Sequence, residues 1–392
     1  MVIAVRIADS ITSIESPWRE ASAGAGPFLS FEFLELLERT ACTGPAAGWA
    51  PCHLLIEDDG EAVALMPAFL KNHSEGEFVF DWAWADAHTR HGFAYYPKLL
   101  VGIPFTPAQG QRVLTPPRID RERSLAAAAH ALVAIGEHLG VSSIHINFLR
   151  DDEAKAFCEA GFLERHGVQL HWHSEGAQTL ADFLTRFDSK RRNQWKRELR
   201  RVQDAGIRWR RLSSEELTPE RMAFVYRCYR ATVDAHAYGR RYLTETFFQE
   251  IARSSLRGSL VVLWAEREND PIAMTFNVKG EGVLYGRYWG AIEHVPFLHF
   301  VLGYAAAIDT ALAEGLHTME SGAGGDHKQA RGFDPTITKS VHWIREPRLR
   351  AAIHDHVSRE RLLMARHVDE LQRGGPWRCA VEGDAPGGSI DD

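Results

Sequence analysis

The order of the predicted elements constrains this chain most, because the same order occurs twice. Apolar spacing and turn signals predict, for the first half, a helix at 31–40, two strands within 52–70 around an Asp58–Asp59–Gly60 turn, a helix near 124–139, and strands at 142–149 and 162–173. The second half opens with helices. It then predicts two strands within 259–278, a strand at 282–290, a helix at 297–315, and strands at 317–321 and 338–344.

A chain of 392 residues is too long for one ordinary core. We therefore predict an α/β fold of two similar units in tandem, each a mixed, mostly antiparallel sheet flanked by helices. The predicted divisions are a first unit at 1–175, a second unit at 176–346, a C-terminal helix at 347–373, and an acidic, disordered tail at 374–392.

Composition narrows the classes of function. The net charge of −7 is modest, so a nucleic-acid partner would have to contact a local basic patch. Five scattered cysteines without a CxxC pair favour neither a disulfide framework nor a zinc site. No run approaches the ~20 apolar residues of a membrane span, and the N-terminus lacks a signal-peptide pattern, so we expect a soluble, cytoplasmic protein. No GxSxG, P-loop or GxGxxG motif supports a hydrolase, an NTPase or a dehydrogenase.

One loop concentrates the residues that favour chemistry, the stretch GAGGDHKQARGFDP at 322–335. Its glycines allow positive φ and a close approach of the backbone to a ligand. Lys328 and Arg331 are three residues apart and could point the same way on one helical turn. A lysine ammonium can stabilise the oxyanion formed during acyl transfer. The competing interpretation is a charged surface turn in which His327 is simply packed.

A second feature is the basic segment at 186–206. Asp188 or Ser189 can cap a helix there, and Gly206 can end it. An apolar stripe of Trp195, Leu199 and Val202 leaves the other faces cationic. A phosphate-rich partner such as tRNA would suit this surface, and a solvated helix with salt bridges is the alternative. The residues predicted to contact phosphate are Lys190, Arg191, Arg192, Lys196 and Arg197.

The aromatic blocks predict both core and binding residues. In FVFDWAWAD (78–86) the alternation predicts a strand with Phe78, Phe80, Trp82 and Trp84 on one buried face. Tyr285, Arg287 and Trp289 alternate in a predicted strand, which suits a flat or anionic ligand, with plain packing as the equal competitor. We expect an acceptor pocket between the two units, and its predicted residues are Asp86, His88, Tyr96, Lys98, Thr106, Tyr285, Arg287, Trp289, His299 and Arg331.

The element order resembles the GNAT acyltransferase fold, and two such units in one chain resemble the Fem-type aminoacyltransferases of peptidoglycan synthesis. Three stretches within residues 27–360 are similar to the defining blocks of a FemAB-like bacterial family: 76–114, YGRYWGAIEHVPFLHF (285–300) and 322–335. Two departures stand out. Val301 follows LHF where the family usually has a glutamate, and GAGGDHK replaces the usual GAQGEHK.

This resemblance implies an acyltransferase that forms an amide bond, with aminoacyl-tRNA as the donor, a small or peptide-like amine as the acceptor, and no tightly bound cofactor. Fem-type enzymes carry an aromatic–lysine pair in the corresponding loop. The resemblance therefore implies Lys328 as the oxyanion stabiliser, with Asp326 or His327 helping to deprotonate the amine.

The donor is the open question. An acetyl-CoA-dependent GNAT binds pyrophosphate at a glycine-rich turn after its third strand. The second unit has no glycine between Gly290 and Gly303, and the stretch 114–124 of the first unit holds two prolines, which lack N–H groups. This weakens an acyl-CoA donor, which stays the first alternative. A non-catalytic protein that binds a peptide or cell-wall ligand is the second, favoured by Val301. The histidine pairs His171/His173 and His354/His356 lack further ligands at metal spacing, so we predict no metal.

Overall fold

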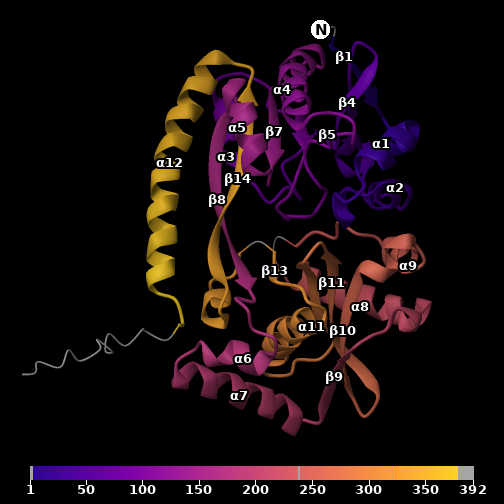
Figure 1. The fold of residues 1–392 in the computed structure, drawn as a ribbon, viewed down its shortest axis with the longest axis vertical. Coiled ribbons are helices and arrows are strands. Elements are labelled where there is room, and N and C mark those ends of the chain that lie inside the picture. Colours follow the sequence, from indigo (N-terminus) through magenta and orange to yellow (C-terminus); the bar gives the residue numbers. More distant parts are fainter. Residues whose placement is uncertain (1–2, 237–238, 323, 378–392) are drawn as a thin grey trace, which may run out of the picture.

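One eleven-stranded sheet runs through both halves of the chain, in the order β2-β5-β6-β7-β14-β8-β13-β12-β11-β10-β9. A computed structural model of the protein describes residues 3–236, 239–322 and 324–377 (Figure 1). The large sheet contains β2 (Trp49–Pro51), β5 (Ala68–Lys71), β6 (Lys98–Val101), β7 (Ser143–Asn147), β8 (Leu163–His173), β9 (Ile207–Arg211), β10 (Leu260–Arg267), β11 (Asp270–Gly280), β12 (Val283–Ala291), β13 (Thr318–Glu320) and β14 (Asp334–Ile344). A separate small sheet holds β1 (Ile3–Ala8), β3 (His53–Asp58) and β4 (Glu61–Met66).

The two halves exchange their last strands at the centre of this sheet. β14, from the end of the chain, lies between β7 and β8 of the first half, and β8 in turn pairs with β13 of the second half. β8 and β14 are long, and in Figure 1 they run from the upper lobe to the lower one. The ladder between them ties the halves together by backbone hydrogen bonds. The unit boundary near residue 175 stays a prediction.

Helices cover the sheet in both lobes, and α12 lies along the outer side of β8 and β14 (Figure 1). The helices are α1 (Glu15–Ala21), α2 (Phe31–Arg39), α3 (Trp82–Arg90), α4 (Arg121–His138), α5 (Asp151–Glu159), α6 (Leu180–Thr185), α7 (Ser189–Asp204), α8 (Pro219–Ala235), α9 (Glu245–Ile251), α10 (Leu298–Phe300), α11 (Ala307–Ala313) and α12 (Pro347–Arg373), with a π-helical turn at Val301–Ala306 between α10 and α11. Within the described residues, no helix has the length and apolarity that a membrane crossing requires. Most of the predicted tail, 378–392, lies outside the described residues.

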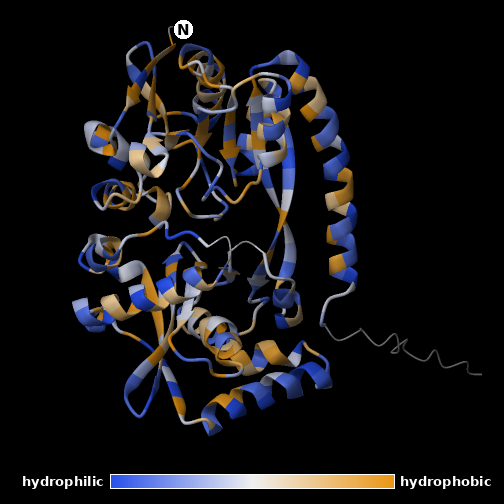
Figure 2. Ribbon diagram, turned by 180° about the vertical axis from the view of Figure 1, so that it is seen from behind, coloured by the Kyte–Doolittle hydropathy of each residue, from blue (hydrophilic) through white to orange (hydrophobic). Residues whose placement is uncertain are grey.

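Buried apolar residues form one large cluster in each lobe, a third at the junction, and a smaller fourth between Trp84 and α12. The junction cluster joins α1 and α2 of the first half to α8, α9 and the start of β10 in the second. Figure 2 shows hydrophobic residues along the strands of both lobes, whereas α7 at the bottom is largely hydrophilic. Val301, the departure from the family's glutamate, is buried in the apolar core of the second lobe.

The predicted strand at 78–84 is wrong. Phe78 has a φ of 61°, and α3 begins at Trp82. Trp84 is buried, but Phe80 and Trp82 are 55% and 57% exposed and stack on each other. A buried carboxylate needs a charged partner, and Asp81 has one in Lys98. The residue expected on the polar side of the alternation is therefore buried, and Phe80 and Trp82 are left at the surface.

Candidate functional site

The candidate site lies where two parallel strands of the second half diverge. β12 and β13 pair from Val283 and Thr318 as far as Tyr285 and Glu320, and the paired register ends there. β12 also carries a bulge against β11, because Gly286 pairs with Asn277 and Tyr288 with Phe276. Arg287 is the extra residue of this bulge. A β-bulge of this kind re-aims a side chain and increases the local twist.

A small cavity of about 80 Å³ opens at this divergence. Arg287 and Trp289 line it from β12, Ser321 from the end of β13, and His299 and Tyr304 from the helix that follows β12. Tyr304 belongs to the π-helical turn, a form that often occurs at functional sites. Trp289 and His299 also line a larger hollow of about 430 Å³ beside the end of α8, so the two openings share a wall.

Lys328 is bonded to Ser321, one of the residues that line this cavity. Its side chain is buried, and its Nζ donates 2.9 Å hydrogen bonds to the carbonyl oxygens of Ser321 and Gly322. An ammonium has three donors, so two of them hold the loop itself. Burial lowers the pKa of Lys328 to about 8. Its charge contributes, after burial, to lowering the pKa of both His171 and His299.

His327 packs among aromatic rings, and its ring and the Lys328 side chain both approach Gly325. It is exposed, and its Nε2 hydrogen-bonds the Tyr304 hydroxyl at 2.8 Å. The His299 and Phe300 rings lie within 6 Å of it, measured between ring centroids. The side chain of Asp326 lies outside what the structure describes, so its predicted role stays a prediction.

Glu320 is a candidate that the sequence reasoning missed. It is the last residue of β13, is 8% exposed, and its Oε2 accepts a 3.2 Å hydrogen bond from the backbone N–H of Gln109. Burial raises the pKa of Glu320 to about 7, against the opposing effects of that N–H, Arg112 and Arg287. The available signal was an acid at the end of a strand that leads into a glycine loop.

The first half contributes the loop 104–112 to this junction. Arg287 donates to the carbonyl of Phe105, and the Gln109 amide donates to the carbonyl of Ile337 on β14. Gln169 on β8 donates to the carbonyl of Pro107. Side-chain hydrogen bonds of β8 and β12, together with those made by Gln109, therefore hold this loop against Glu320.

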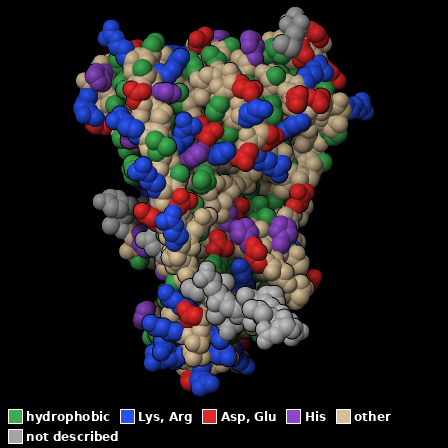
Figure 3. All heavy atoms as spheres, turned by 60° about the vertical axis from the view of Figure 1, so that its left-hand side comes forward, with side chains coloured by type: hydrophobic (Ala, Val, Ile, Leu, Met, Phe, Trp, Pro, Cys, Tyr) green, Lys and Arg blue, Asp and Glu red, His purple; other side chains and the backbone are tan. Residues whose placement is uncertain are grey.

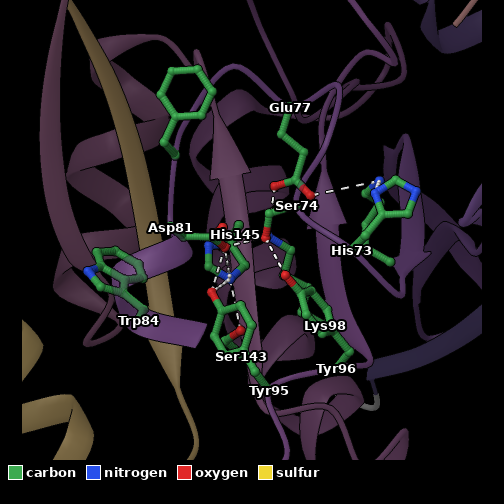
Figure 4. Close-up of polar contacts among 12 residues, drawn as sticks. His73, Ser74, Glu77, Asp81, Trp84, Tyr95, Tyr96, Lys98, Ser143 and His145 are labelled. Carbon is green, nitrogen blue, oxygen red and sulfur yellow. Dashed lines mark hydrogen bonds and ion pairs between the residues drawn. The ribbon is translucent and has the colours of Figure 1, made fainter. Parts of the chain in front are cut away.

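The first half has its own buried polar cluster, formed by Lys98 and by side chains of the segment 74–95 (Figure 4). Lys98 is fully buried and donates to Ser74 at 3.0 Å, to Glu77 at 2.8 Å and to Asp81. The Tyr95 hydroxyl donates, at 2.5 Å, to the same oxygen of Asp81 as Lys98 does. Burial raises the pKa of Glu77 to about 7, whereas the Lys98 ammonium outweighs burial at Asp81 and holds its pKa below the ordinary value.

The predicted acceptor-pocket residues of the first half separate into different places. Lys98 belongs to the buried cluster, and Tyr96 hydrogen-bonds Ser74 beside it. His88 is buried against the carbonyl of Trp84, and Asp86 is exposed and ion-paired with Arg90. Thr106 is buried at the junction between the halves. The structure does not bring these residues to one pocket.

Two expectations for the second half need correction. Tyr285, Arg287 and Trp289 do not share one face, because the bulge at Arg287 inverts the alternation. Tyr285 packs on Phe28 of the junction core, whereas Trp289 packs in the second-half core. The side chains of Arg331 and Lys328 do not point the same way. It is buried in an ion pair with Glu198 of α7, at 2.6 Å, and serves packing there.

The FemAB-like family model, described as peptidoglycan biosynthesis/recognition, matches residues 10–379. The chain belongs to the FemAB-like family. No curated protein sequence matches it. The match extends over nearly the whole chain, so membership covers both halves and the exchanged strands. The prediction that the protein is an enzyme, an acyltransferase, is thereby confirmed.

Solved structures share the fold of this FemAB-like chain at low sequence identity. The C-terminal domain of a putative lysylphosphatidylglycerol synthetase from Agrobacterium fabrum has 10% identity and a TM-score of 0.52, and the match covers 88% of this chain and 94% of that one. A conserved protein of unknown function from Bacteroides thetaiotaomicron has 9% identity and a TM-score of 0.51, covering 88% and 100%. FemX has 11% identity and a TM-score of 0.49, covering 90% and 100%. The predicted tandem GNAT-like fold is confirmed.

The FemAB-like chain also carries the predicted basic helix at its lower end. α7 spans Ser189–Asp204, with Asp188 as its N-cap, as predicted. Trp195 and Val202 face the core, and Glu198 faces inward to Arg331. Figure 3 shows Lys and Arg side chains gathered at this end. Its exposed cations are Lys190, Lys196, Arg197, Arg200 and Arg201, while Arg191 and Arg192 are half-buried.

Proposed function

We propose that this FemAB-like enzyme transfers an aminoacyl group from aminoacyl-tRNA to the amine of a small or peptide-like acceptor. The observation that carries the proposal is the buried Lys328 ammonium beside the cavity at the β12–β13 divergence. A fixed cation near a small, partly dry cavity suits a reaction that develops negative charge on a carbonyl oxygen. Lys328 would bind that oxygen with its remaining donor.

The chemistry needs positioning more than a strong nucleophile. The acceptor nitrogen attacks the acyl carbon, and a C–N bond forms as the carbonyl π electrons move to oxygen. The tetrahedral oxyanion then collapses, the ester C–O bond breaks, and the 3′-terminal oxygen of the tRNA leaves with the electron pair and takes up a proton. The nitrogen loses the proton that balances this step.

The basic face of α7 supports tRNA as the donor. Arg201 of α7 stacks at 5.5 Å on Phe297, and Phe297 lines the larger hollow that shares Trp289 and His299 with the cavity. One cation of the basic face thus lies beside the hollow that shares a wall with the cavity. Phosphate contacts on such a helix and base stacking on aromatic rings are the usual means of holding single-stranded RNA ends.

The test incubates the purified enzyme with cell extract and either charged tRNA or acyl-CoA, and finds by mass spectrometry which molecule gains mass. We expect product with charged tRNA. Lys328→Ala should lower turnover ten- to a thousandfold, the loss of one charged oxyanion donor. Lys155→Ala, a largely exposed lysine on α5, is the matched control and should leave turnover unchanged.

Each other outcome identifies an alternative. Product formed with acyl-CoA and no tRNA would favour an acyl-CoA-dependent N-acyltransferase. Tight binding of a peptide or cell-wall ligand without product from any donor would favour a binding protein. Unchanged turnover in Lys328→Ala would remove Lys328 from the mechanism.

A further inference from the structure

We propose that the hydroxyl of Ser321 is a second hydrogen-bond donor to the acyl oxygen, beside the Lys328 ammonium. This inference rests on the proposed function and names a further residue of the same site. During acyl transfer the carbonyl oxygen gains negative charge, and enzymes stabilise that charge with donors that are already in place. A lysine can supply one such donor, and a neutral hydroxyl can supply another.

Ser321 joins the cavity to the buried lysine. It is the first residue after β13, at the point where β12 and β13 cease to pair, and it is one of the residues that line the cavity. Its carbonyl oxygen accepts a 2.9 Å hydrogen bond from Lys328 Nζ. The ammonium is therefore held at the same residue that carries the hydroxyl, and an oxygen bound by the hydroxyl would lie close to the lysine.

Strand alternation places the Ser321 side chain on the cavity side. Side chains two residues apart on a strand point to the same face, and Met319, two residues before Ser321, also lines the cavity. Gly286 lies across from both on β12, where an added Cβ would be 3.4 Å from Ser321 and 3.5 Å from the Met319 side chain. A glycine at position 286 therefore keeps space open beside Ser321.

The hydroxyl oxygen of Ser321 is buried, and no described residue hydrogen-bonds it. Most buried polar atoms in proteins are hydrogen-bonded, because a buried group without a partner costs free energy. Of the described residues that line the cavity, Ser321 is the one with such an atom. Other buried atoms without a partner in the described chain, such as Trp49 Nε1 and Asn147 Oδ1, belong to residues that line neither this cavity nor the larger hollow. A substrate oxygen in the cavity would give the Ser321 hydroxyl its partner.

Several other polar side chains of the cavity already have partners. The Tyr304 hydroxyl bonds to His327 at 2.8 Å. The Asn277 amide donates to Thr275 Oγ1 and to a main-chain carbonyl of β10, at 2.9 Å each. Arg287 donates to a carbonyl of the loop from the first half. These bonds hold the walls of the cavity, and they leave the hydroxyl at the end of β13 for the substrate.

Ser321 acts without forming a covalent bond. As the acceptor nitrogen attacks, the carbonyl π electrons move to oxygen, and the hydrogen bond from the Ser321 O–H to that oxygen strengthens while the hydroxyl keeps its proton. When the oxyanion collapses, the electrons return to the carbonyl and the ester C–O bond breaks, so the hydroxyl ends unchanged. The step needs no oxidant, reductant or further reactant.

Steady-state kinetics of Ser321→Ala in the full-length enzyme, with the donor and acceptor found active, test the proposal. The value of kcat should fall about a hundredfold, the usual loss for one oxyanion donor, and KM should change less than about threefold, because the bond strengthens only in the transition state. A change confined to KM, or a kcat within about threefold of wild type, would overturn the proposal while leaving the acyltransferase function standing. A donor-dependent mass gain of the protein that is lost in Ser321→Ala would also overturn it, because Ser321 would then be a nucleophile.

Ser143→Ala is the matched control, because Ser143 is a buried serine of β7 whose hydroxyl has a partner, the Nε2 of His145 at 2.8 Å. It should leave kcat and KM unaltered. Its midpoint of thermal unfolding should fall, because a buried hydrogen bond is lost. The midpoint of Ser321→Ala should stay level or rise, because that variant removes a buried polar atom without a partner in the described chain.

The unfolding measurement applies even if no donor gives product, which would itself contradict the proposed function. A midpoint of Ser321→Ala at or above that of wild type supports a hydroxyl that is held for a ligand. A lowered midpoint, as in Ser143→Ala, overturns the inference, because the Ser321 hydroxyl would then be bonded within the protein.

Discussion

Each half contains an equivalent pair of parallel strands, and the surroundings of the point where the pairing ends differ between the halves. In the first half β6 and β7 pair as far as Val101 and Ile146, and the next carbonyl, of Asn147, accepts the Nε–H of Arg112 at 2.7 Å. In the second half β12 and β13 pair as far as Glu320, and the next carbonyl, of Ser321, accepts the ammonium of Lys328. A buried cation thus follows each divergence.

What differs is the space beside the cation. Arg112 is fully buried, and its guanidinium donates to the main-chain carbonyls of Asn147, Ala108 and Gln111. Its own side chain therefore fills the first divergence, the place where β6 and β7 cease to pair. Lys328 stands beside a cavity. One architecture can therefore serve as scaffold in one half and leave room for a reaction in the other. The bulge of β12, the π-helical turn and the side chains beside the strand ends make the difference.

The largest effect is expected in the buried cluster of the first half. Lys98→Met removes the cation from Glu77 and Asp81 and should lower the free energy of unfolding by about 3–5 kcal/mol, because it leaves uncompensated buried carboxylates. Urea unfolding measures this, with Lys155→Met as the exposed control. A loss below about 1 kcal/mol in the free energy of unfolding would mean that the cluster does not stabilise the first half.

The variant Arg112→Ala tests whether the Arg112 side chain fills the space where the pairing of β6 and β7 ends. The variant leaves main-chain carbonyls without donors and opens a void, so we expect a loss of about 2–3 kcal/mol in the free energy of unfolding. A crystal structure of the variant should show the emptied space between β6 and β7. If stability were unchanged, Arg112 would not be a structural plug and the contrast between the halves would weaken.

The pH profile sharpens the contrast from the second half. Lys328 must stay an ammonium, so activity should fall, up to tenfold per pH unit, as the pH passes about 8. Initial rates over a pH series that brackets this value measure the fall. In Lys328→Arg the loss of activity at alkaline pH should vanish, because a guanidinium stays charged. If the loss persisted in this variant, another group would be responsible for it.

The basic face of α7 provides a smaller test. Reversing the charge at Arg191, Arg192 and Lys196 should weaken tRNA binding severalfold and reduce the dependence of log affinity on log salt. Filter binding over a salt series measures both. Reversal of Arg253, a mostly exposed cation that follows α9, should change neither. An unaltered salt slope would exclude α7 as the contact.

The smallest effect is expected on the surface of the first half. Trp82→Ser removes an exposed ring that stacks only on exposed Phe80, so the free energy of unfolding should change by less than about 0.5 kcal/mol. Thermal unfolding of Trp84→Ser, at the buried position two residues on, gives the contrast, with an expected loss of several kcal/mol. Equal losses would show that residue 82 is core after all.

The sequence by itself determined the element order, the cap of α7 at Asp188 and the glycine loop that carries Lys328, because local periodicity and turn chemistry encode them. Only the tertiary structure decided where the polar residues act. The bulge at Arg287 turns Tyr285 and Trp289 apart, Arg331 meets Glu198 from a distant helix, and the Gln109 N–H reaches Glu320 from the other half. The last two contacts join residues more than a hundred positions apart. Burial, which raises the pKa of Glu320 and lowers that of Lys328, is a property of the packed chain alone.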